Sequence, residues 1–162
     1  GVLVIEPRKS RGFNWNWSNN GKVTLNVTVP SLRGTQLAGA GDVRIDAVKA
    51  DRFDGGIAGA GDLSVERIEV GALTMDIAGA GSAKLGTGRV KTAEYEIAGS
   101  GGIDAKGVAA ETASVSIMGS GSVQANAAKT ASISIMGSGD VDMTGGAKCT
   151  ISKAGSGDVR CS

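Results

Sequence analysis

The sequence contains no histidine and few aromatic residues: two tryptophans, two phenylalanines and one tyrosine among 162 residues. Without histidine, neither a Ser-His-Asp nor a Cys-His catalytic arrangement can form within the chain, and zinc sites with histidine ligands are excluded. No apolar run approaches the roughly 18 residues of a membrane-spanning helix. The 17 Lys and Arg nearly balance the 16 Asp and Glu. This balance argues against a nucleic-acid partner, because proteins that bind nucleic acids carry a basic footprint.

Glycine is abundant instead, with 27 residues, against a usual share of about 7% of a chain. A short block around Gly-Ala/Ser-Gly recurs seven times, most often in the form Ile-Ala/Met-Gly-Ala/Ser-Gly-Asp/Ser, and its first glycines are spaced by 20, 20, 20, 20, 18 and 18 residues. The paired glycines are Gly39, Gly41, Gly59, Gly61, Gly79, Gly81, Gly99, Gly101, Gly119, Gly121, Gly137, Gly139, Gly155 and Gly157. Because glycine adopts positive φ angles without steric cost, these pairs predict sharp structural corners.

Apolar residues alternate on both sides of each corner, as in Leu73, Met75 and Ile77 before one corner and Val123 and Ala125 after another. A period of two predicts strands with one buried face. Each unit is therefore expected to be a strand, a glycine corner, a second strand and a variable return. Both a meander of hairpins and a solenoid fit such units. The period and the small inward residues favour an all-β, single-domain, right-handed parallel β-solenoid of about seven to eight coils, each with 18 to 20 residues.

Residues 1–36 lack the glycine block, and we expect capping strands and an aromatic loop there, followed by repeats and a C-terminal cap over residues 37–162. The loop holds Phe13, Trp15 and Trp17, with Asn14 and Asn16 between them. Two interpretations remain open. The aromatic side chains form either a lid on the first coil or a platform that binds a sugar ring.

The two cysteines lie near the C-terminus, at Cys149 and Cys161. Both fall in columns that point inward, on the two strands joined by the last glycine corner. This placement predicts a disulfide bond in the terminal coil, although two buried free thiols would also fit. A disulfide would indicate an oxidising compartment.

The corners carry a ladder of acidic and small residues after the second glycine: Asp42, Asp62, Ser82, Gly102, Ser122, Asp140 and Asp158. Stacked carboxylates repel each other unless a cation or a hydrogen-bond donor lies nearby, so calcium is one alternative. The preferred interpretation is that Asp and Ser bond to backbone amides in the turn. We therefore predict no cofactor and no metal site.

A second acidic group comprises Asp76, Glu94 and Glu96, which the alternation places outward on neighbouring strands. Acid pairs of this kind could catalyse hydrolysis or lyase cleavage of a polysaccharide. Serine, threonine and basic residues surround them, which is typical of a solvated sheet face. We expect no catalytic residues here, and the weak acidic cluster remains the enzymatic alternative.

The repeated blocks and the closing segment Lys148–Cys161 resemble the family named putative auto-transporter adhesin, head GIN domain, over the chain from about residue 23 to its end. The resemblance implies a β-helical fold and an exported bacterial protein, located in the periplasm, at the outer membrane or on the cell surface. It implies no established activity and no catalytic residues. The sequence shows no signal peptide, and we expect the leader to have been removed if the chain is exported.

These observations together predict a non-enzymatic, adhesin-like module of the cell envelope that binds a glycan or an envelope protein through flat β-faces. We expect no nucleic-acid partner and no transmembrane segment in the chain. Self-association remains an alternative. A pectinase-like enzyme and a purely structural or oligomerising module are the alternatives.

Overall fold

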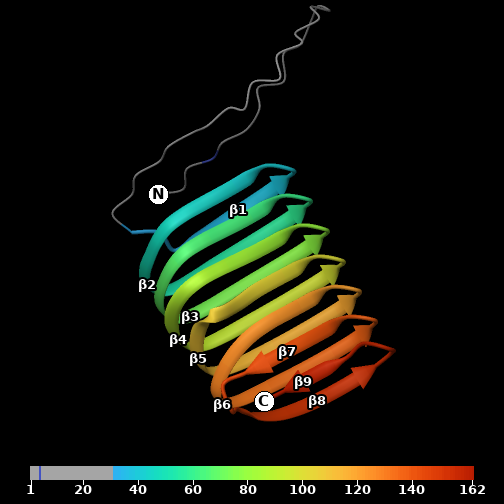
Figure 1. Ribbon diagram of the computed structural model, residues 1–162. Coiled ribbons are helices and arrows are strands. Elements are labelled where there is room, and N and C mark those ends of the chain that lie inside the picture. The colour runs from blue at the N-terminus through green and yellow to red at the C-terminus, as the bar shows by residue number, and fades with distance from the viewer. Residues whose placement is uncertain (1–3, 5–30) are drawn as a thin grey trace, which may run out of the picture.

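Strands alone make up the regular structure in the computed structural model, which describes residue 4 and residues 31–162 (Figure 1). They are β1 (Gly34–Gly39), β2 (Asp42–Gly59), β3 (Asp62–Gly79), β4 (Ser82–Gly99), β5 (Gly102–Gly119), β6 (Ser122–Gly137), β7 (Asp140–Thr144), β8 (Lys148–Ala154) and β9 (Val159–Cys161). Every pairing is parallel, in the order β1-β2-β3-β4-β5-β6-β7-β9, with β8 paired to β6. The chain is thus a β-solenoid of about six turns, as predicted.

The coil has a right-handed sense. In Figure 1 the chain leaves each glycine corner at the right, crosses the near side to the left and returns on the far side, while it descends from β1 to β8. A right-handed path is also the usual one for connections between parallel strands.

Each full coil has three faces, where the sequence pattern indicated only two strands and a return. In β3, pairing covers residues 62–65, then 67–70, then 72–79, with breaks at Glu66 and Gly71. At the first break the inward residues Val65 and Ile68 lie three apart, so the strand changes direction there. We name these segments the first face, the second face and the long face. The variable return is therefore a third strand segment with its own buried residues.

The second face accounts for the shorter spacing in the last coils. Pairing between β5 and β6 skips residues 106–108, so β6 has only a remnant of that face. In the next coil Gly145 and Gly146, with φ angles of 104° and 78°, replace it with a tight turn. The two-residue deletions thus fall on the second face and leave the long face intact.

The two glycines of a corner serve different purposes. Gly79, like the first glycine of each other corner, has a positive φ angle, here 127°. The second glycine, Gly81, needs its missing side chain because a Cβ atom there would lie 2.7 Å from Cγ2 of Ile57 in the coil before. The first glycine is therefore required for its backbone conformation, and both glycines are required for close packing where a preceding coil lies against the corner.

The core is a narrow column of stacked apolar side chains. Among the described residues, no polar or charged residue is classed as buried apart from the phenol of Tyr95. Isoleucine recurs as a fully buried column on the long face, at Ile57, Ile77, Ile97, Ile117 and Ile135. Each coil buries its inward residues against the next, so stability comes from stacking along the axis.

The disulfide between Cys149 and Cys161 closes the C-terminal coil and confirms that prediction, with a Cα–Cα distance of 6.6 Å. It links β8 to β9 across a sequence separation of 12 residues. A loop of that size corresponds to a stabilisation of about 3 kcal/mol. Cys149 is half-buried and Cys161 is exposed.

The predicted domain boundary at residue 36 falls inside β1, which begins at Gly34 and pairs with β2. Most of the expected capping region therefore lies outside the described residues. Within the described part of the chain, no helix is long and apolar enough to cross a membrane.

Candidate functional site

The long face is the largest regular surface of the molecule, a parallel sheet built from β1, the last parts of β2 to β6, and β8. Its outward side chains form four rows that run along the solenoid axis, with neighbours about 4.8 Å apart. The Thr92 row holds Arg52, Ala72, Thr92, Thr112, Thr130 and Lys148. The Glu94 row holds Asp54, Thr74, Glu94, Ser114, Ser132 and Thr150. The Glu96 row holds Gln36, Gly56, Asp76, Glu96, Ser116, Ser134 and Ser152, and the Ala98 row holds Ala38, Ala58, Ala78, Ala98, Met118, Met136 and Ala154.

The structure brings the predicted acidic cluster together on this face. Asp76 lies opposite Glu96 in the β3–β4 register, and Glu94 is two residues before Glu96 on the same strand. All three side chains are exposed. Partial burial first, and then the negative charges of Glu96, Glu94 and Asp54, raise the pKa of Asp76. The N-terminal half of the long face is therefore acidic.

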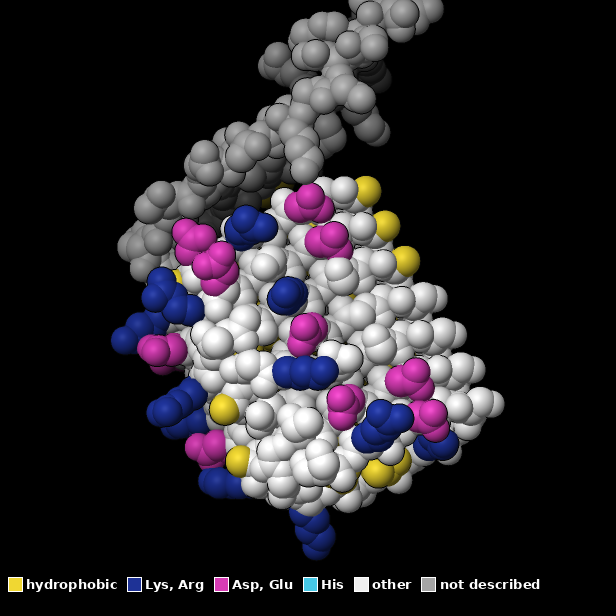
Figure 2. Space-filling model, in the orientation of Figure 1, with side chains coloured by type: hydrophobic (Ala, Val, Ile, Leu, Met, Phe, Trp, Pro, Cys, Tyr) yellow, Lys and Arg dark blue, Asp and Glu magenta, His cyan; other side chains and the backbone are white. Residues whose placement is uncertain are grey.

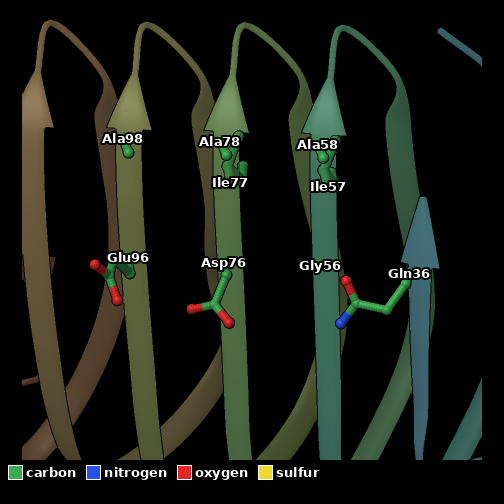
Figure 3. A pocket seen from close by; sticks show the side chains of 9 residues that line it. All are labelled: Gln36, Gly56, Ile57, Ala58, Asp76, Ile77, Ala78, Glu96 and Ala98. Carbon is green, nitrogen blue, oxygen red and sulfur yellow. The ribbon is translucent and has the colours of Figure 1, made fainter. Parts of the chain in front are cut away.

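A shallow groove of about 250 Å³ follows the Glu96 row (Figure 3). Gln36, Asp76 and Glu96 project along it from successive strands, with a gap at Gly56. The side chain of Gln36 leans over that gap, since a Cβ atom on Gly56 would lie 2.7 Å from its Cδ. Ala58, Ala78 and Ala98 supply the small side chains of the groove.

A second groove, of about 390 Å³, lies between the Thr92 and Glu94 rows. Arg52 stands at one end, and its Nε donates a hydrogen bond of 2.7 Å to Oδ1 of Asp54. Its Nη2 also donates to Oγ1 of Thr74, at 3.4 Å. The groove is hollow at Ala72 because that side chain is small. Thr92, Thr112, Glu94 and Ser114 line the rest of it.

The C-terminal half of the long face is uncharged over β5 and β6 and rich in hydroxyl groups. Ser114, Ser132 and Ser134 are exposed there. The Ala98 row contains two exposed methionines in register, Met118 and Met136, with 42% and 57% of their surface accessible. The long face thus passes from acidic, through hydroxyl-bearing, to partly apolar surface.

The first face has a different character. In Figure 2 the near side of the molecule shows acidic and basic side chains interspersed, with no single-sign patch. One ion pair lies on this side, between Lys106 and Asp142 at 4.0 Å. Exposed pairs of this kind are typical of a solvated surface and contribute little to stability.

The corner aspartates have donors close by. The hydroxyl of Ser82 donates to Oδ1 of Asp62, and the backbone N–H of Asp158 donates to Oδ1 of Asp140 at 2.9 Å. Within the described residues, no group of three or more acidic or cysteine side chains could hold a metal ion. The alternative of calcium at these corners stays a prediction.

The predicted aromatic site of Phe13, Trp15 and Trp17, with Asn14 and Asn16, lies outside the described residues. Its two interpretations, as a lid or as a sugar platform, stay predictions. The hollow at Ala72 was missed by sequence reasoning. Its signal was the single alanine between Arg52 and Thr92 in an outward row, which becomes visible only once the register is known.

Comparison with known proteins gives a family and two solved structures. The family model described as "Putative auto-transporter adhesin, head GIN domain" matches residues 1–147. The match ends before the cysteine pair and begins before residue 23, so its limits differ from those of the expected resemblance. No curated protein matches the chain.

One solved structure is of a putative lipid binding protein from Parabacteroides distasonis, with a TM-score of 0.76 and 29% identity. The similarity covers 78% of this chain and 51% of that protein. The other is of a putative adhesin from Bacteroides fragilis, with a TM-score of 0.74 and 26% identity, over 80% of this chain and 60% of that protein. This chain therefore spans between half and two thirds of the length of each solved structure.

Proposed function

The chain belongs to the putative auto-transporter adhesin, head GIN domain family, and from this membership we propose that it is an exported, non-enzymatic module of the cell envelope. In this proposal the module binds a glycan or an envelope protein through its long face. The disulfide between Cys149 and Cys161 supports export, because such bonds persist in oxidising compartments.

The observation that carries the proposal is the unbroken long face. Its register continues from β1 to β8 without a bulge within the face, while the deletions of the last coils fall on the second face. The face presents hydroxyl, carboxylate and amide groups at a constant strand spacing of about 4.8 Å. Repeated polar groups on a rigid sheet suit an extended ligand better than a compact one.

A pair of lysine substitutions on neighbouring strands tests this proposal. Ser114→Lys places a long charged side chain on the long face of β5, and Gln124→Lys places the same side chain on the first face of β6. We expect binding to an array of glycans and matrix proteins to be lost in Ser114→Lys and kept in Gln124→Lys. Equal binding by both variants, with equal melting temperatures, would refute a role for the long face.

The name of the Parabacteroides distasonis protein raises lipid as a ligand class. The interior of the described coils is packed with buried side chains, so a lipid would bind at the surface of this chain. Met118 and Met136 are the exposed apolar side chains available on the long face. Sedimentation with phosphatidylcholine vesicles, compared between the native protein and a Met118→Ser/Met136→Ser variant, separates this from glycan binding.

The enzymatic alternative rests on the raised pKa of Asp76 beside Glu96, since a carboxyl group with a raised pKa is better suited to act as a general acid. The open position of both carboxylates on a flat face argues against it, because water is not excluded there. Incubation with polysaccharides, followed by assay of reducing ends and unsaturated products, tests the alternative. Activity that is lost in Asp76→Asn and Glu96→Gln would replace the binding proposal.

A further inference from the structure

The groove between the Thr92 and Glu94 rows has the chemistry of a sugar-binding site. It offers a guanidinium at Arg52, a carboxylate at Glu94, and hydroxyl groups at Thr92, Thr112 and Ser114. Its floor includes the methyl group of Ala72 and the backbone of Leu73 and Ala93, whose side chains are buried in the core. Donors and acceptors around a small apolar floor match a sugar ring, which has hydroxyl groups at its rim and C–H groups on its faces.

Several of these polar groups are free to bind. Within the described residues, no side-chain hydrogen bond engages Thr92, Glu94 or Ser114, whereas Thr112 donates only a long bond of 3.4 Å to the carbonyl oxygen of Lys91. The backbone groups of the sheet are committed to the parallel ladders. In this groove a ligand can therefore form hydrogen bonds only with side chains.

The same features disfavour a folded protein as the occupant. Protein interfaces centre on large buried anchors, usually aromatic residues or arginine, which insert into deep pockets. This groove is shallow, and its hollow is set by one alanine side chain, Ala72. It runs over four strands, from Arg52 on β2 to Ser114 on β5, a distance of about 14 Å at the usual strand spacing.

The charges select among glycans. The Nε of Arg52 forms an ion pair with Asp54 at 2.7 Å. Arg52 is the one cationic side chain among the residues that line the groove, so none of these lining residues is an unpaired cation. Glu94, with Asp76 and Glu96 in the adjacent row, gives the surroundings a negative potential. An anionic sugar would be repelled, while hydroxyl groups of an uncharged sugar can donate to the carboxylate of Glu94 and accept from Thr92.

We propose that this groove binds a linear, uncharged oligosaccharide laid along the solenoid axis. The inference rests on the proposed function and names its ligand class and its position on the long face. Sugar hydroxyls exchange hydrogen bonds with Thr92, Glu94 and Ser114, and one ring face packs on Ala72.

Filling the hollow tests the proposal. Ala72→Leu adds a side chain at an outward position that the solvent already reaches, and Ala58→Leu makes the same change in the Glu96-row groove of the same face. The probes are cellotetraose and xylotetraose, with tetragalacturonic acid as the charged comparison, measured by isothermal titration calorimetry. We expect the uncharged probes to bind, with an affinity that falls at least about ten-fold in Ala72→Leu and is unchanged in Ala58→Leu. Thr92→Ala should weaken binding by about three- to ten-fold, the effect of one neutral hydrogen bond.

The outcomes separate this inference from the function it rests on. If binding is lost in Ala58→Leu and kept in Ala72→Leu, the ligand lies in the other groove and the inference is wrong, while a role for the long face stands. Preferential binding of a charged probe, or no binding of either uncharged probe, also overturns the inference. Loss of binding in Gln124→Lys but not in Ser114→Lys overturns the long-face function itself.

Discussion

The ammonium group of Lys153 donates a hydrogen bond of 2.7 Å to the backbone carbonyl oxygen of Gly157, across the last glycine corner. Lys153 is in register with Ile135, so it occupies the column that isoleucine fills in the preceding coils. In the preceding coils an isoleucine packs beneath the next corner, whereas here a lysine extends across its own corner. Ile151 on the same strand remains 48% exposed.

We therefore expect the Lys153→Ile variant to self-associate through its C-terminal end. The substitution places a second isoleucine near Ile151, beside a strand edge that has no partner among the described residues, and such edges pair with other chains. Sedimentation velocity should show concentration-dependent association of the variant. Lys84→Ile, the same change at an exposed position of β4, is the control. Association of both variants, or of neither, would show that Lys153 does not protect this end.

A buried phenol lies at the middle of the solenoid. The side chain of Tyr95 is fully buried, and its hydroxyl has no hydrogen-bond partner among the described residues. Its coil makes room through small inward residues: Ala83, Gly88 and Ala93 replace Leu63, Ile68 and Leu73 of the coil before. An unpaired buried hydroxyl costs about 1–3 kcal/mol.

Tyr95→Phe should therefore raise the free energy of unfolding, by about 1 kcal/mol, in guanidinium denaturation. Tyr95→Ala should lower it by about 3–5 kcal/mol, because it leaves a cavity. Together the two variants separate the hydroxyl from the ring. A less stable Tyr95→Phe protein would mean that the hydroxyl has a favourable partner.

The same residue predicts a pH dependence. Burial raises the pKa of Tyr95 far above its ordinary value, which is about 10 in an unfolded chain. The folded state thus holds the phenolic proton more tightly than the unfolded state. The stability that Tyr95 contributes is complete below pH 10 and falls as the pH rises above it. Native Tyr95, the only tyrosine, should show tyrosinate absorbance only on unfolding, and Tyr95→Phe should lose less stability in alkali.

The sequence alone was sufficient to predict the solenoid, its corners and its disulfide. Seven glycine blocks at regular spacing fit a meander or a solenoid, and their period and the small inward residues favour the solenoid. The inward columns place Cys149 next to Cys161. The second face was not predicted, since Val65 and Ile68 are separated by two outward residues and interrupt the period of two. A three-residue interval between inward residues is the signal for a bend between faces.

The candidate site was less predictable. The outward direction of Asp76, Glu94 and Glu96 follows from alternation, and their proximity follows from the coil length. The groove at Ala72 depends on the absence of a side chain in a row of larger ones. Such a hollow depends on side-chain volumes in three neighbouring coils at once, which a pattern along one strand does not contain.

The acidic cluster predicts a stabilising substitution. Partial burial, and then Glu96, raise the pKa of Asp76, so this carboxyl is less stable in its ionised form than in an unfolded chain. Stability from Asp76 is therefore gained as the pH falls through its raised pKa and is missing at neutral pH. Glu96→Gln should raise the melting temperature at pH 7. The gain should shrink below about pH 4, where carboxyl groups are protonated, and in high salt.

Glu66→Gln is the matched control for this effect, because Glu66 is exposed at a different corner of the coil. Differential scanning fluorimetry across pH measures both variants. An equal gain in melting temperature in Glu66→Gln would mean that the change results from net charge. A loss of stability in Glu96→Gln at pH 7 would contradict repulsion within the cluster.

The first glycine of a corner can be required because of its positive φ angle, because the preceding coil leaves no space for a side chain, or for both reasons. Two alanine substitutions separate these contributions. Gly39 and Gly79 have φ angles of 109° and 127°, so alanine is strained at both, at a cost of about 1–3 kcal/mol. Among the described residues, a Cβ atom on Gly39 meets nothing within 4 Å, whereas on Gly79 it would collide with the carbonyl oxygen of Gly59 in the coil before. Gly39→Ala should therefore lose only the conformational part. Gly79→Ala should lose more stability, because two coils must separate to admit the methyl group.

Guanidinium denaturation measures the difference in stability between the two variants, and soluble yield measures it if Gly79→Ala does not fold. Equal losses would mean that backbone strain alone accounts for glycine at these corners, and that the coils are not packed as closely there as the structure shows.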